Sequence, residues 1–213
     1  MRVSASASGC CRRQRKALWQ VCDELAYPFG PLIQLLLLTS QRKREVGEVP
    51  WHELDLDKRV WSLPSHRAKN GHAHDIHLSD LAIEIIERLP RLAQPGDGGF
   101  VFSFDGQRPV AATSYHKPLI DRRLQQILGP VEAWTIHDLR RTVATGMAEL
   151  GVAPHVLDRV QNHVNGTIKG VARIYNRHQY SVERKAALDA WGHHLTALVY
   201  PERARANVIE MRR

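Results

Sequence analysis

A histidine and an arginine stand three residues apart near the start of a predicted helix. Thr135 and Asp138 have the spacing of a capping box, which predicts that the helix begins here. His137 and Arg140 then share one face of its first turn, and Arg141 points elsewhere. Backbone amides and the helix dipole favour an anion at such a position. The pair therefore indicates an oxyanion or phosphate site, and the alternative is a solvated basic face.

A second arginine stands where a dense apolar segment turns polar. Arg42 follows the apolar residues 31–38, and Glu45 is three residues further along the predicted helix end. A carboxylate at this spacing can hold the guanidinium in place. The alternative is a solvated charge run at the end of a helix, and the local pattern leaves both interpretations open.

His163 and Tyr175 stand near the end of the chain, twelve residues apart. The histidine ends a short predicted helix, and the tyrosine lies in the segment GVARIYNRH. Taken alone, a tyrosine in such a segment is most simply a half-buried residue with its hydroxyl at the surface.

Histidine is abundant, with 12 residues, and two groups could suggest a zinc or nuclease site. On a strand, His72 and His74 share one face and His77 points to the other. His193 and His194 form the second group. Neither group has a cysteine nearby or the H-x-x-x-H pair with a carboxylate that a zinc site needs, so we expect no metal.

Hydrophobic periodicity predicts an α+β domain that is mainly helical, with a small three-stranded antiparallel sheet. Alternation predicts strands at residues 54–56, 59–63 and 73–78, with a hairpin tip at residues 67–72. A short extended segment is expected at residues 100–104. Helical spacing covers residues 16–26, 31–38, 79–89, 113–128, 135–150, 154–161 and 181–198.

Composition narrows the class of protein. The 213 residues carry 30 basic and 22 acidic side chains, so the net charge is 30 − 22 = +8, which suggests a polyanionic partner, with nucleic acid first. No apolar run approaches the roughly 18 residues that span a bilayer. The three cysteines all lie within residues 10–22, so no disulfide framework is expected. With no signal-peptide pattern at the start, a cytoplasmic location fits best.

Three regions are expected along the chain. Residues 1–15 are basic and rich in serine and alanine, which predicts a disordered arm. Residues 16–200 form the domain, and residues 201–213 form a C-terminal tail.

Taken in order, the candidate site residues resemble those of the catalytic domain of the tyrosine recombinase, or phage integrase, family. The resemblance covers roughly residues 18–191, and the segments LLLLTSQRKREV and WTIHDLRRTVATG are especially similar to prophage integrases. The ordered set is Thr39-Ser40-Gln41-Arg42 with Glu45, then Lys69 in Ala68-Lys69-Asn70, then His137-Asp138-Leu139-Arg140-Arg141-Thr142, His163 and Tyr175.

The resemblance implies site-specific DNA recombination, for integration or excision, by strand cleavage and rejoining. Tyr175 would attack a DNA phosphodiester and form a 3′-phosphotyrosyl link. Arg42 and Arg140 would bind the non-bridging phosphate oxygens, to which His163 would donate a third hydrogen bond. Because the covalent link conserves the energy of the phosphodiester, neither ATP nor a metal is implied.

The remaining implied roles concern protons and DNA. His137 would accept a proton or bind the phosphate, Lys69 on the hairpin would protonate the leaving 5′-oxygen, and Glu45 would support Arg42. Tyr180 and Tyr115 are rival nucleophiles, and Lys117 is a rival general acid. Further contacts to double-stranded DNA are expected from Lys43, Arg44, Asn70 and Arg141.

The chain departs from the family pattern at several points. Ser40 stands where glycine is usual, Arg44 where a small residue is common, and Gln161-Asn162-His163 where Leu-Gly-His is common. Only about 16 residues precede the first predicted helix, so we expect a natural truncation, a degraded prophage product or a piece of a longer protein. The alternative function is a non-catalytic DNA-binding remnant. A relaxing enzyme like type IB topoisomerases is a third interpretation.

The last predicted helix carries a stripe of Ala, Trp191 and Leu side chains. By resemblance, the stripe could dock onto a neighbouring protomer and form a dimer or tetramer on DNA. The alternative is that it packs on its own domain.

Overall fold

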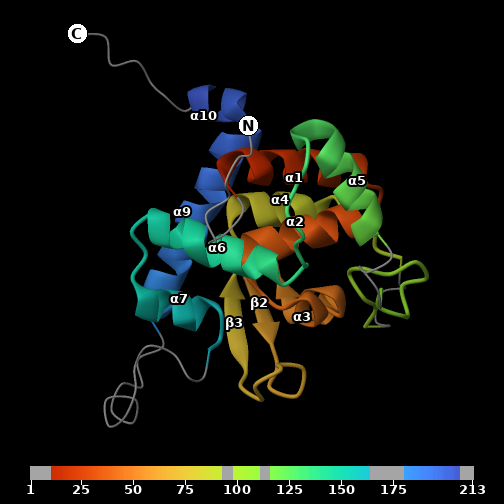
Figure 1. Ribbon diagram of the computed structural model, residues 1–213. Helices are drawn as coiled ribbons and strands as arrows, with labels where there is room; N and C mark the ends of the chain where they lie inside the picture. Colours follow the sequence, from red (N-terminus) through yellow and green to blue (C-terminus); the bar gives the residue numbers. More distant parts are fainter. Residues whose placement is uncertain (1–10, 93–97, 111–115, 164–179, 207–213) are drawn as a thin grey trace.

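The computed structural model describes residues 11–92, 98–110, 116–163 and 180–206 (Figure 1). As predicted, these residues form a mainly helical fold with one three-stranded antiparallel sheet. The elements are α1 (Arg12–Glu24), α2 (Phe29–Thr39), α3 (Lys43–Gly47), η1 (Trp51–Glu53), β1 (Leu54–Asp55), β2 (Val60–Leu63), β3 (His74–His77), α4 (Asp80–Glu87), α5 (Lys117–Leu128), α6 (Asp138–Glu149), α7 (Pro154–Val160), α9 (Ser181–Val199) and α10 (Pro201–Ala206).

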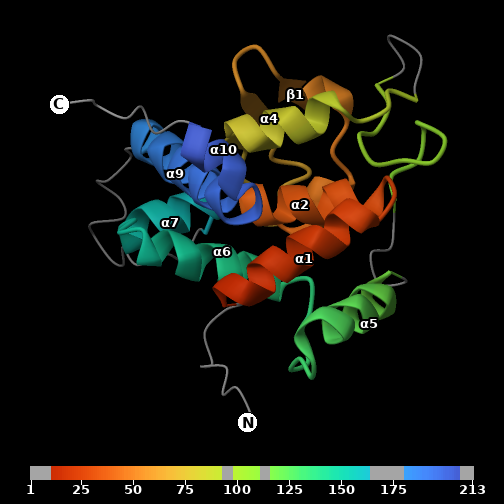
Figure 2. The ribbon, with the colours of Figure 1, turned by 90° about the horizontal axis from the view of Figure 1, so that it is seen from above.

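Helix α2 forms the centre of the core. Every residue of this helix except Pro31 is buried, as its dense apolar sequence predicts. Helices α1, α4, α6 and α9 pack around it, and Figure 2 shows α2 between α1 and α4. A Cβ atom at Gly30 would lie 2.1 Å from the carbonyl oxygen of Cys22, so glycine allows α2 to begin this close to α1.

The sheet follows the predicted alternation. Its strand order is β1-β2-β3, and Trp61 pairs with Ile76 in the antiparallel register. Trp61, Leu63 and Ile76 face the core, while Ser62 and Asp75 face outward and are joined by a hydrogen bond of 2.9 Å. Between β2 and β3 the chain forms the loop of residues 64–73, which we call the Lys69 loop.

Two helices extend into the regions predicted to flank the domain. Helix α1 begins at Arg12, inside the predicted arm, because Arg15 is buried over the Trp191 ring with 5.5 Å between guanidinium carbon and ring centroid. Helix α10 lies inside the predicted tail, where Arg203 donates to both oxygens of Glu84 at 3.0 and 2.9 Å. Residues 1–10 and 207–213 lie outside the described residues.

The structure adds detail at three other predicted elements. Residues 100–104 form isolated bridges at Phe100 and Ser103 instead of a strand, because the Ser103 hydroxyl organises a turn with Asp105 and Gly106. Ser79 stands at the start of α4, but its Oγ makes no capping bond. Helix α5 begins at Lys117, and the predicted residues 113–115 lie outside the described part of the chain.

Helix α6 begins at Asp138 with His137 as its N-cap, three residues later than predicted, but Thr135 and Asp138 do bind each other. Asp138 Oδ2 accepts hydrogen bonds of 2.8 Å from both the amide and the hydroxyl of Thr135. These bonds hold the pKa of Asp138 below its usual value. The carboxylate therefore fixes the chain at the point where His137 enters the helix.

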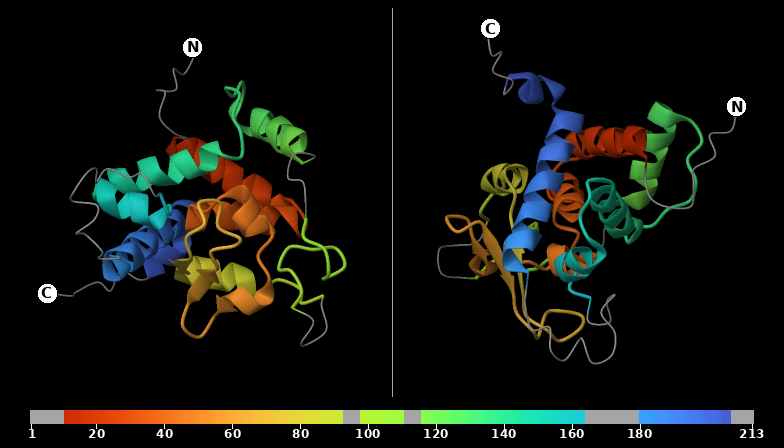
Figure 3. Two further views of the ribbon diagram at one scale, coloured as in Figure 1. Left: turned by 90° about the horizontal axis from the view of Figure 1, so that it is seen from below. Right: turned by 90° about the vertical axis from the view of Figure 1, so that its left-hand side faces the viewer.

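Helix α9 packs into its own domain. Its apolar stripe contacts α1, α2, α4, α6 and α7, as the right-hand view of Figure 3 shows for α1 and α2. Trp191 is fully buried, and its Nε1 donates to the carbonyl oxygen of Leu37 at 2.7 Å. A Cβ atom at Gly146 would lie 2.2 Å from the Trp191 ring, so this glycine makes room for it. In this chain the stripe packs on its own domain, as the alternative interpretation expects, and docking on a second protomer stays a prediction.

No helix in the described ranges is both long enough and apolar enough to cross a membrane.

Candidate active site

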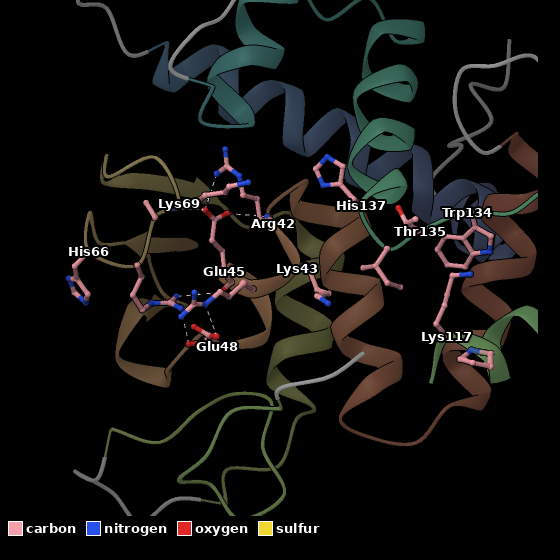
Figure 4. A pocket seen from close by; sticks show the side chains of 15 residues that line it. Arg42, Lys43, Glu45, Glu48, His66, Lys69, Lys117, Trp134, Thr135 and His137 are labelled. Atoms are coloured by element: carbon pink, nitrogen blue, oxygen red, sulfur yellow. Dashed lines mark hydrogen bonds and ion pairs between the residues drawn. The ribbon is translucent and has the colours of Figure 1, made fainter. Parts of the chain in front are cut away.

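A cleft of about 970 Å³ opens between the Lys69 loop and the beginnings of α5 and α6. Figure 4 shows Arg42, Glu45 and Lys69 on one side of it and His137 and Trp134 on the other. Its lining residues are Arg42, Lys43, Arg44, Glu45, Glu48, His66, Arg67, Ala68, Lys69, Lys117, Pro118, Trp134, Thr135, Ile136 and His137. Basic side chains dominate this surface, which therefore suits an anionic ligand.

Arg42 is fixed by the carboxylate that the sequence predicts. It stands at the N-cap of α3 in extended conformation, and Glu45 Oε2 accepts from its backbone amide at 3.0 Å. The other oxygen, Oε1, accepts from the Arg42 guanidinium at 2.9 Å. Because the Glu45 side chain is only 2% exposed, this ion pair is shielded from water and holds Arg42 in one orientation.

The same carboxylate also binds the Lys69 loop. The backbone amide of Lys69 donates to Glu45 Oε1 at 3.2 Å, while the Lys69 side chain is exposed on the cleft. Glu45 thus joins Arg42 to Lys69, the predicted general acid.

Arg67 anchors the beginning of the loop, a role that the sequence did not reveal. Its guanidinium donates to both oxygens of Glu53 at 2.7 and 2.6 Å and to the carbonyl oxygen of Glu48 at 2.9 Å. Glu53 also accepts from Trp61 Nε1 at 2.9 Å. This pairing attaches the loop firmly to η1 and α3.

Arg140 is buried, and its guanidinium binds carbonyl groups at the ends of α2 and α7. Its NH1 group donates to the carbonyl oxygen of Ser40 at 2.7 Å, and NH2 donates to that of Gln161. Gln161 Nε2 in turn donates to Ser40 Oγ at 2.8 Å and to the Arg140 carbonyl oxygen at 3.0 Å. We call Ser40, Arg140 and Gln161 the Arg140 network.

The positive charge of Arg42 acts on buried Arg140, which does not itself line the cleft. Burial, and next the positive charge of Arg42, lower the pKa of Arg140 to about 10, whereas Glu45 opposes the shift. Two guanidinium groups that repel each other favour an anion between them, because a phosphate relieves that repulsion.

The two predicted histidines differ in their surroundings. His137 is exposed and lines the cleft at the N-cap of α6. Beyond α7, His163 Nδ1 lies 3.3 Å from Asp158 Oδ1. Burial, followed by the charge of Arg140, lowers the pKa of His163, and Asp158 opposes the shift. His163 is therefore electrostatically coupled to the arginines.

Tyr175 and the rival Tyr115 lie outside the described residues. The other rival, Tyr180, stands at the N-cap of α9 with a φ of 50°, and its ring centroid lies 4.9 Å from that of His155.

Lys117, the rival general acid, lines the same cleft. Its Nζ donates to both oxygens of Asp121 at 2.6 and 2.7 Å and lies 4.0 Å from the centroid of the Trp134 ring. Trp134 and His66 also line the cleft, and neither was predicted as a site residue. Trp134 could have been suspected from the sequence, because it is an aromatic residue directly before Thr135.

Of the four residues predicted to contact DNA, only two are exposed on the cleft. Lys43 and Arg44 are exposed on the cleft, and Arg44 Nε donates to Glu48 at 2.9 Å. Arg141 is exposed on α6 and donates to Asp138 at 3.2 Å, but it is not among the cleft residues. Asn70 uses its side-chain amide within the protein, as described below.

The histidines of the hairpin are separated as strand geometry predicts. His74 is buried, where Nε2 donates to the Val160 carbonyl oxygen at 3.1 Å and Nδ1 accepts from Arg184 at 3.1 Å. Burial, then Arg184, lowers its pKa to about 4. His77 instead lies 2.7 Å from Asp189. Across the described part of the chain, no three His, Cys, Asp or Glu residues form a group that could hold a metal.

Comparison with solved structures identifies the class of fold. The chain superposes on the Tn1549 transposon integrase, solved in complex with a circular intermediate DNA, with a TM-score of 0.62. That match has 18% identity and covers 76% of this chain and 60% of the other. XerA recombinase gives a TM-score of 0.61 at 15% identity, covering 94% and 66%. The fold is that of tyrosine recombinase catalytic domains.

Sequence comparison assigns the family. The model of the phage integrase family matches residues 12–181, so the chain belongs to this family. Prophage integrase IntA of Escherichia coli (strain K12) is 30% identical over 159 residues, which are 73% of this chain and 36% of IntA. The integrase of Salmonella phage P22 is 22% identical over 148 residues, 66% of this chain and 38% of its own length. The chain thus spans less than two fifths of these two relatives.

Proposed function

We propose that this chain cleaves and rejoins DNA strands in site-specific recombination, with Tyr175 as the nucleophile. The observation that carries the proposal is the convergence of Arg42, Lys69 and His137 on one cleft, with buried Arg140 electrostatically coupled to Arg42. This set supplies anion binding and proton transfer at one place, which are the needs of phosphoryl transfer to a phenol. Membership of the phage integrase family supports the same reaction.

In the proposed cleavage step, the Tyr175 oxygen attacks a backbone phosphorus while the bond from phosphorus to the 5′-oxygen breaks. Negative charge accumulates on the non-bridging oxygens, where Arg42 and Arg140 bind it. His137 takes up the phenolic proton or adds a phosphate contact, and Lys69 gives a proton to the leaving oxygen. A 3′-phosphotyrosyl link and a free 5′-hydroxyl result.

His163 is the third proposed phosphate ligand. The arginine charges favour its neutral form in the free protein, because they lower its pKa. A bound phosphate brings negative charge beside it and favours the protonated ring, which can then donate a hydrogen bond to the phosphate. DNA binding and protonation of His163 are thus expected to reinforce each other.

Rejoining reverses these steps. The 5′-hydroxyl of the same or another strand attacks the phosphotyrosyl link, and Tyr175 leaves. The energy of the original phosphodiester is kept in the covalent link, so the proposed cycle requires no nucleoside triphosphate.

The direct test is covalent trapping on a nicked duplex from which the cleaved fragment diffuses away. The wild-type chain should form a protein–DNA adduct that survives denaturing electrophoresis. Tyr175→Phe should form none, whereas Tyr180→Phe should form the adduct as the matched control. DNA binding without an adduct would favour the non-catalytic remnant, and relaxation of supercoils without recombinant products would favour a topoisomerase-like enzyme.

Double-stranded DNA is the proposed partner, and the reaction places the protein in the cytoplasm with it. The net charge of +8 and the basic cleft support binding through phosphates. We expect weak binding with strong salt dependence, because each neutralised phosphate releases counterions. A nanomolar affinity for one site that salt does not change would contradict this.

Self-association on DNA as a dimer or tetramer is also proposed, since exchange between two duplexes needs several cleavage sites. In this chain the stripe of α9 is buried within its own domain. Sedimentation of the chain with and without a DNA site tests the assembly directly.

A further inference from the structure

The Lys69 loop makes a second attachment, three residues after its anchor at Arg67. Asn70 directly follows Lys69, and Asn162 directly precedes His163. These two asparagines, 92 positions apart, bind each other through their side chains.

The contact between them is reciprocal. Asn70 Nδ2 donates to the backbone carbonyl oxygen of Asn162 at 2.6 Å, and Asn162 Nδ2 donates back to Asn70 Oδ1 at 3.3 Å. Asn162 Nδ2 also donates to the carbonyl oxygen of His72 at 3.1 Å. Within the loop, Asn70 Oδ1 accepts from the His72 amide at 3.1 Å. We call these two residues the asparagine pair.

The backbone at Asn162 explains which residue types fit there. Its φ of 50° lies in the left-handed region, which glycine and asparagine tolerate best. Glycine would supply the conformation without a side-chain amide. Asparagine supplies both, so at this position the side chain adds the link to the loop.

We infer that Asn70 and Asn162 are positioning residues, whose amide pair holds the Lys69 loop against the His163 turn and thereby keeps the Lys69 ammonium beside the leaving oxygen. This inference rests on the proposed function. It gives Asn70 an indirect role in place of the direct DNA contact expected from the sequence. The group that gives the proton and a group that binds the phosphate are thereby fixed relative to each other.

Loss of the pair should leave the protein folded, because the base of the loop has other attachments. Arg67 still pairs with Glu53, and the Lys69 amide still binds Glu45. The expected effect is therefore a less well defined Lys69 position and not an unfolded domain.

The experiment compares two leaving groups. One substrate is the nicked duplex with an ordinary 5′-oxygen, and the other carries sulfur in the bridging 5′ position at the cleavage site. A thiolate leaves without a proton, so the sulfur substrate bypasses the general acid. Asn162→Gly is the main variant, because it removes the amide and suits the φ of 50°. Asn70→Ala is the second, and Lys69→Ala is the reference.

On the oxygen substrate, Asn162→Gly and Asn70→Ala should each form the adduct about tenfold to a hundredfold more slowly than the wild type, as expected for a misplaced group. Asn70→Ala should be the slower of the two, because Asn162→Gly keeps the backbone carbonyl oxygen that Asn70 Nδ2 binds at 2.6 Å. The double variant should be slowed by less than the product of the two single effects, since both changes remove bonds of one link. On the sulfur substrate, all of them should react within about threefold of the wild type, like Lys69→Ala. Ser62→Ala, which breaks the outward Asp75 bond of the same hairpin, should match the wild type on both substrates.

Outcomes that contradict the inference are distinct from those that contradict the function. If the wild type forms no adduct on either substrate, the proposed function fails and the positioning role fails with it. If the wild type reacts and the asparagine variants equal it, or are slow on both substrates, only the positioning role is overturned.

Hydrogen exchange tests the link without a measurement of activity. The amides of residues 65–72 should exchange faster in Asn162→Gly than in the wild type, and unchanged exchange there would also overturn the positioning role.

Discussion

The Arg140 network contains a proposed phosphate ligand and the Lys69 loop carries the proposed proton donor, and the two regions are built differently. Arg140 is 5% exposed and donates to carbonyl groups at the ends of two helices. The Lys69 side chain is exposed on a loop that is held at its base by Arg67 and at its tip by the asparagine pair.

This difference follows from what each group has to do. A phosphate ligand acts best when it is held in one position. For a buried side chain, the conformational entropy is lost when the core folds and not when DNA binds. A proton donor must reach an oxygen that appears only when DNA is bound, and an exposed side chain on a pinned loop allows that. Changes in the network should therefore alter both stability and activity, whereas changes in the loop should alter activity alone.

The largest expected effect is that of Arg140→Ala. It leaves two buried carbonyl groups without their donor, so the free energy of unfolding should fall by about 3 kcal/mol. Adduct formation should slow by roughly 10³-fold or more, because a guanidinium at the phosphate is lost. Denaturant unfolding and adduct rates measure the two effects. The exposed neighbour Arg141→Ala is the control and should change stability little; equal losses in the two variants would remove the distinction between buried and exposed arginines.

Lys69→Ala should separate activity from stability. The adduct should form roughly 10²- to 10⁴-fold more slowly on the oxygen substrate, as expected when a general acid is removed. The unfolding midpoint should stay where it is in the wild type, because the side chain is exposed. Lys58→Ala, at the far end of the same sheet, should leave the adduct rate unchanged. A large fall in the midpoint of Lys69→Ala would show that the loop belongs to the core.

Acid should destabilise the point where the two regions meet. His74, at the end of the Lys69 loop, bonds to Val160 just before Gln161, and its pKa falls from 6.5 to about 4 on folding. Between these values the unfolded chain binds a proton that the folded chain does not, so stability should fall as pH falls from 6.5 to 4. The shift of 6.5 − 4 = 2.5 corresponds to roughly 3 kcal/mol.

Denaturant unfolding at several pH values, compared with His74→Gln, measures this contribution. The variant should lose less stability than the wild type over this pH range, because glutamine does not titrate. Identical pH dependence in both proteins would assign the acid sensitivity to groups other than His74.

The smallest expected effect concerns the side chains that complete the Arg140 network. Gln161→Leu removes the bonds to Ser40 Oγ and to the Arg140 carbonyl oxygen, and should cost about 1 to 2 kcal/mol. Ser40→Gly removes the same contact from the other side, but glycine suits the φ of 58° at this position and should be closer to neutral. A double-mutant cycle measures the coupling. Strictly additive effects would show that the two side chains do not act together.

Much of the fold could be read from local pattern. The apolar run of residues 31–38 predicted a helix buried on most sides, and the alternation around Trp61 and Ile76 predicted the antiparallel sheet. The ends of elements were harder to predict. Arg15 extends α1 into a basic segment because it packs on Trp191, a residue 176 positions away (191 − 15). Only the fold supplies that contact.

Part of the site could also be predicted, because its spacing is local. Glu45 three residues after Arg42 forms the expected ion pair, and the Thr135 box places His137 at a helix start. The partners of Arg140 and the link from Asn70 to Asn162 could not be found in this way. Tyr175 remains a prediction from the sequence.

The sequence by itself determined which segments become helix or strand and which side chains are suited to chemistry on a phosphate, since both follow from residue types and from spacings of two to four positions. Tertiary structure alone decided which of those side chains are rigid. Ser40 lies 100 positions from Arg140, and Asn70 lies 92 from Asn162. Contacts over such separations depend on how helices pack around α2, because loop closure and burial, and not local backbone preference, bring their atoms together.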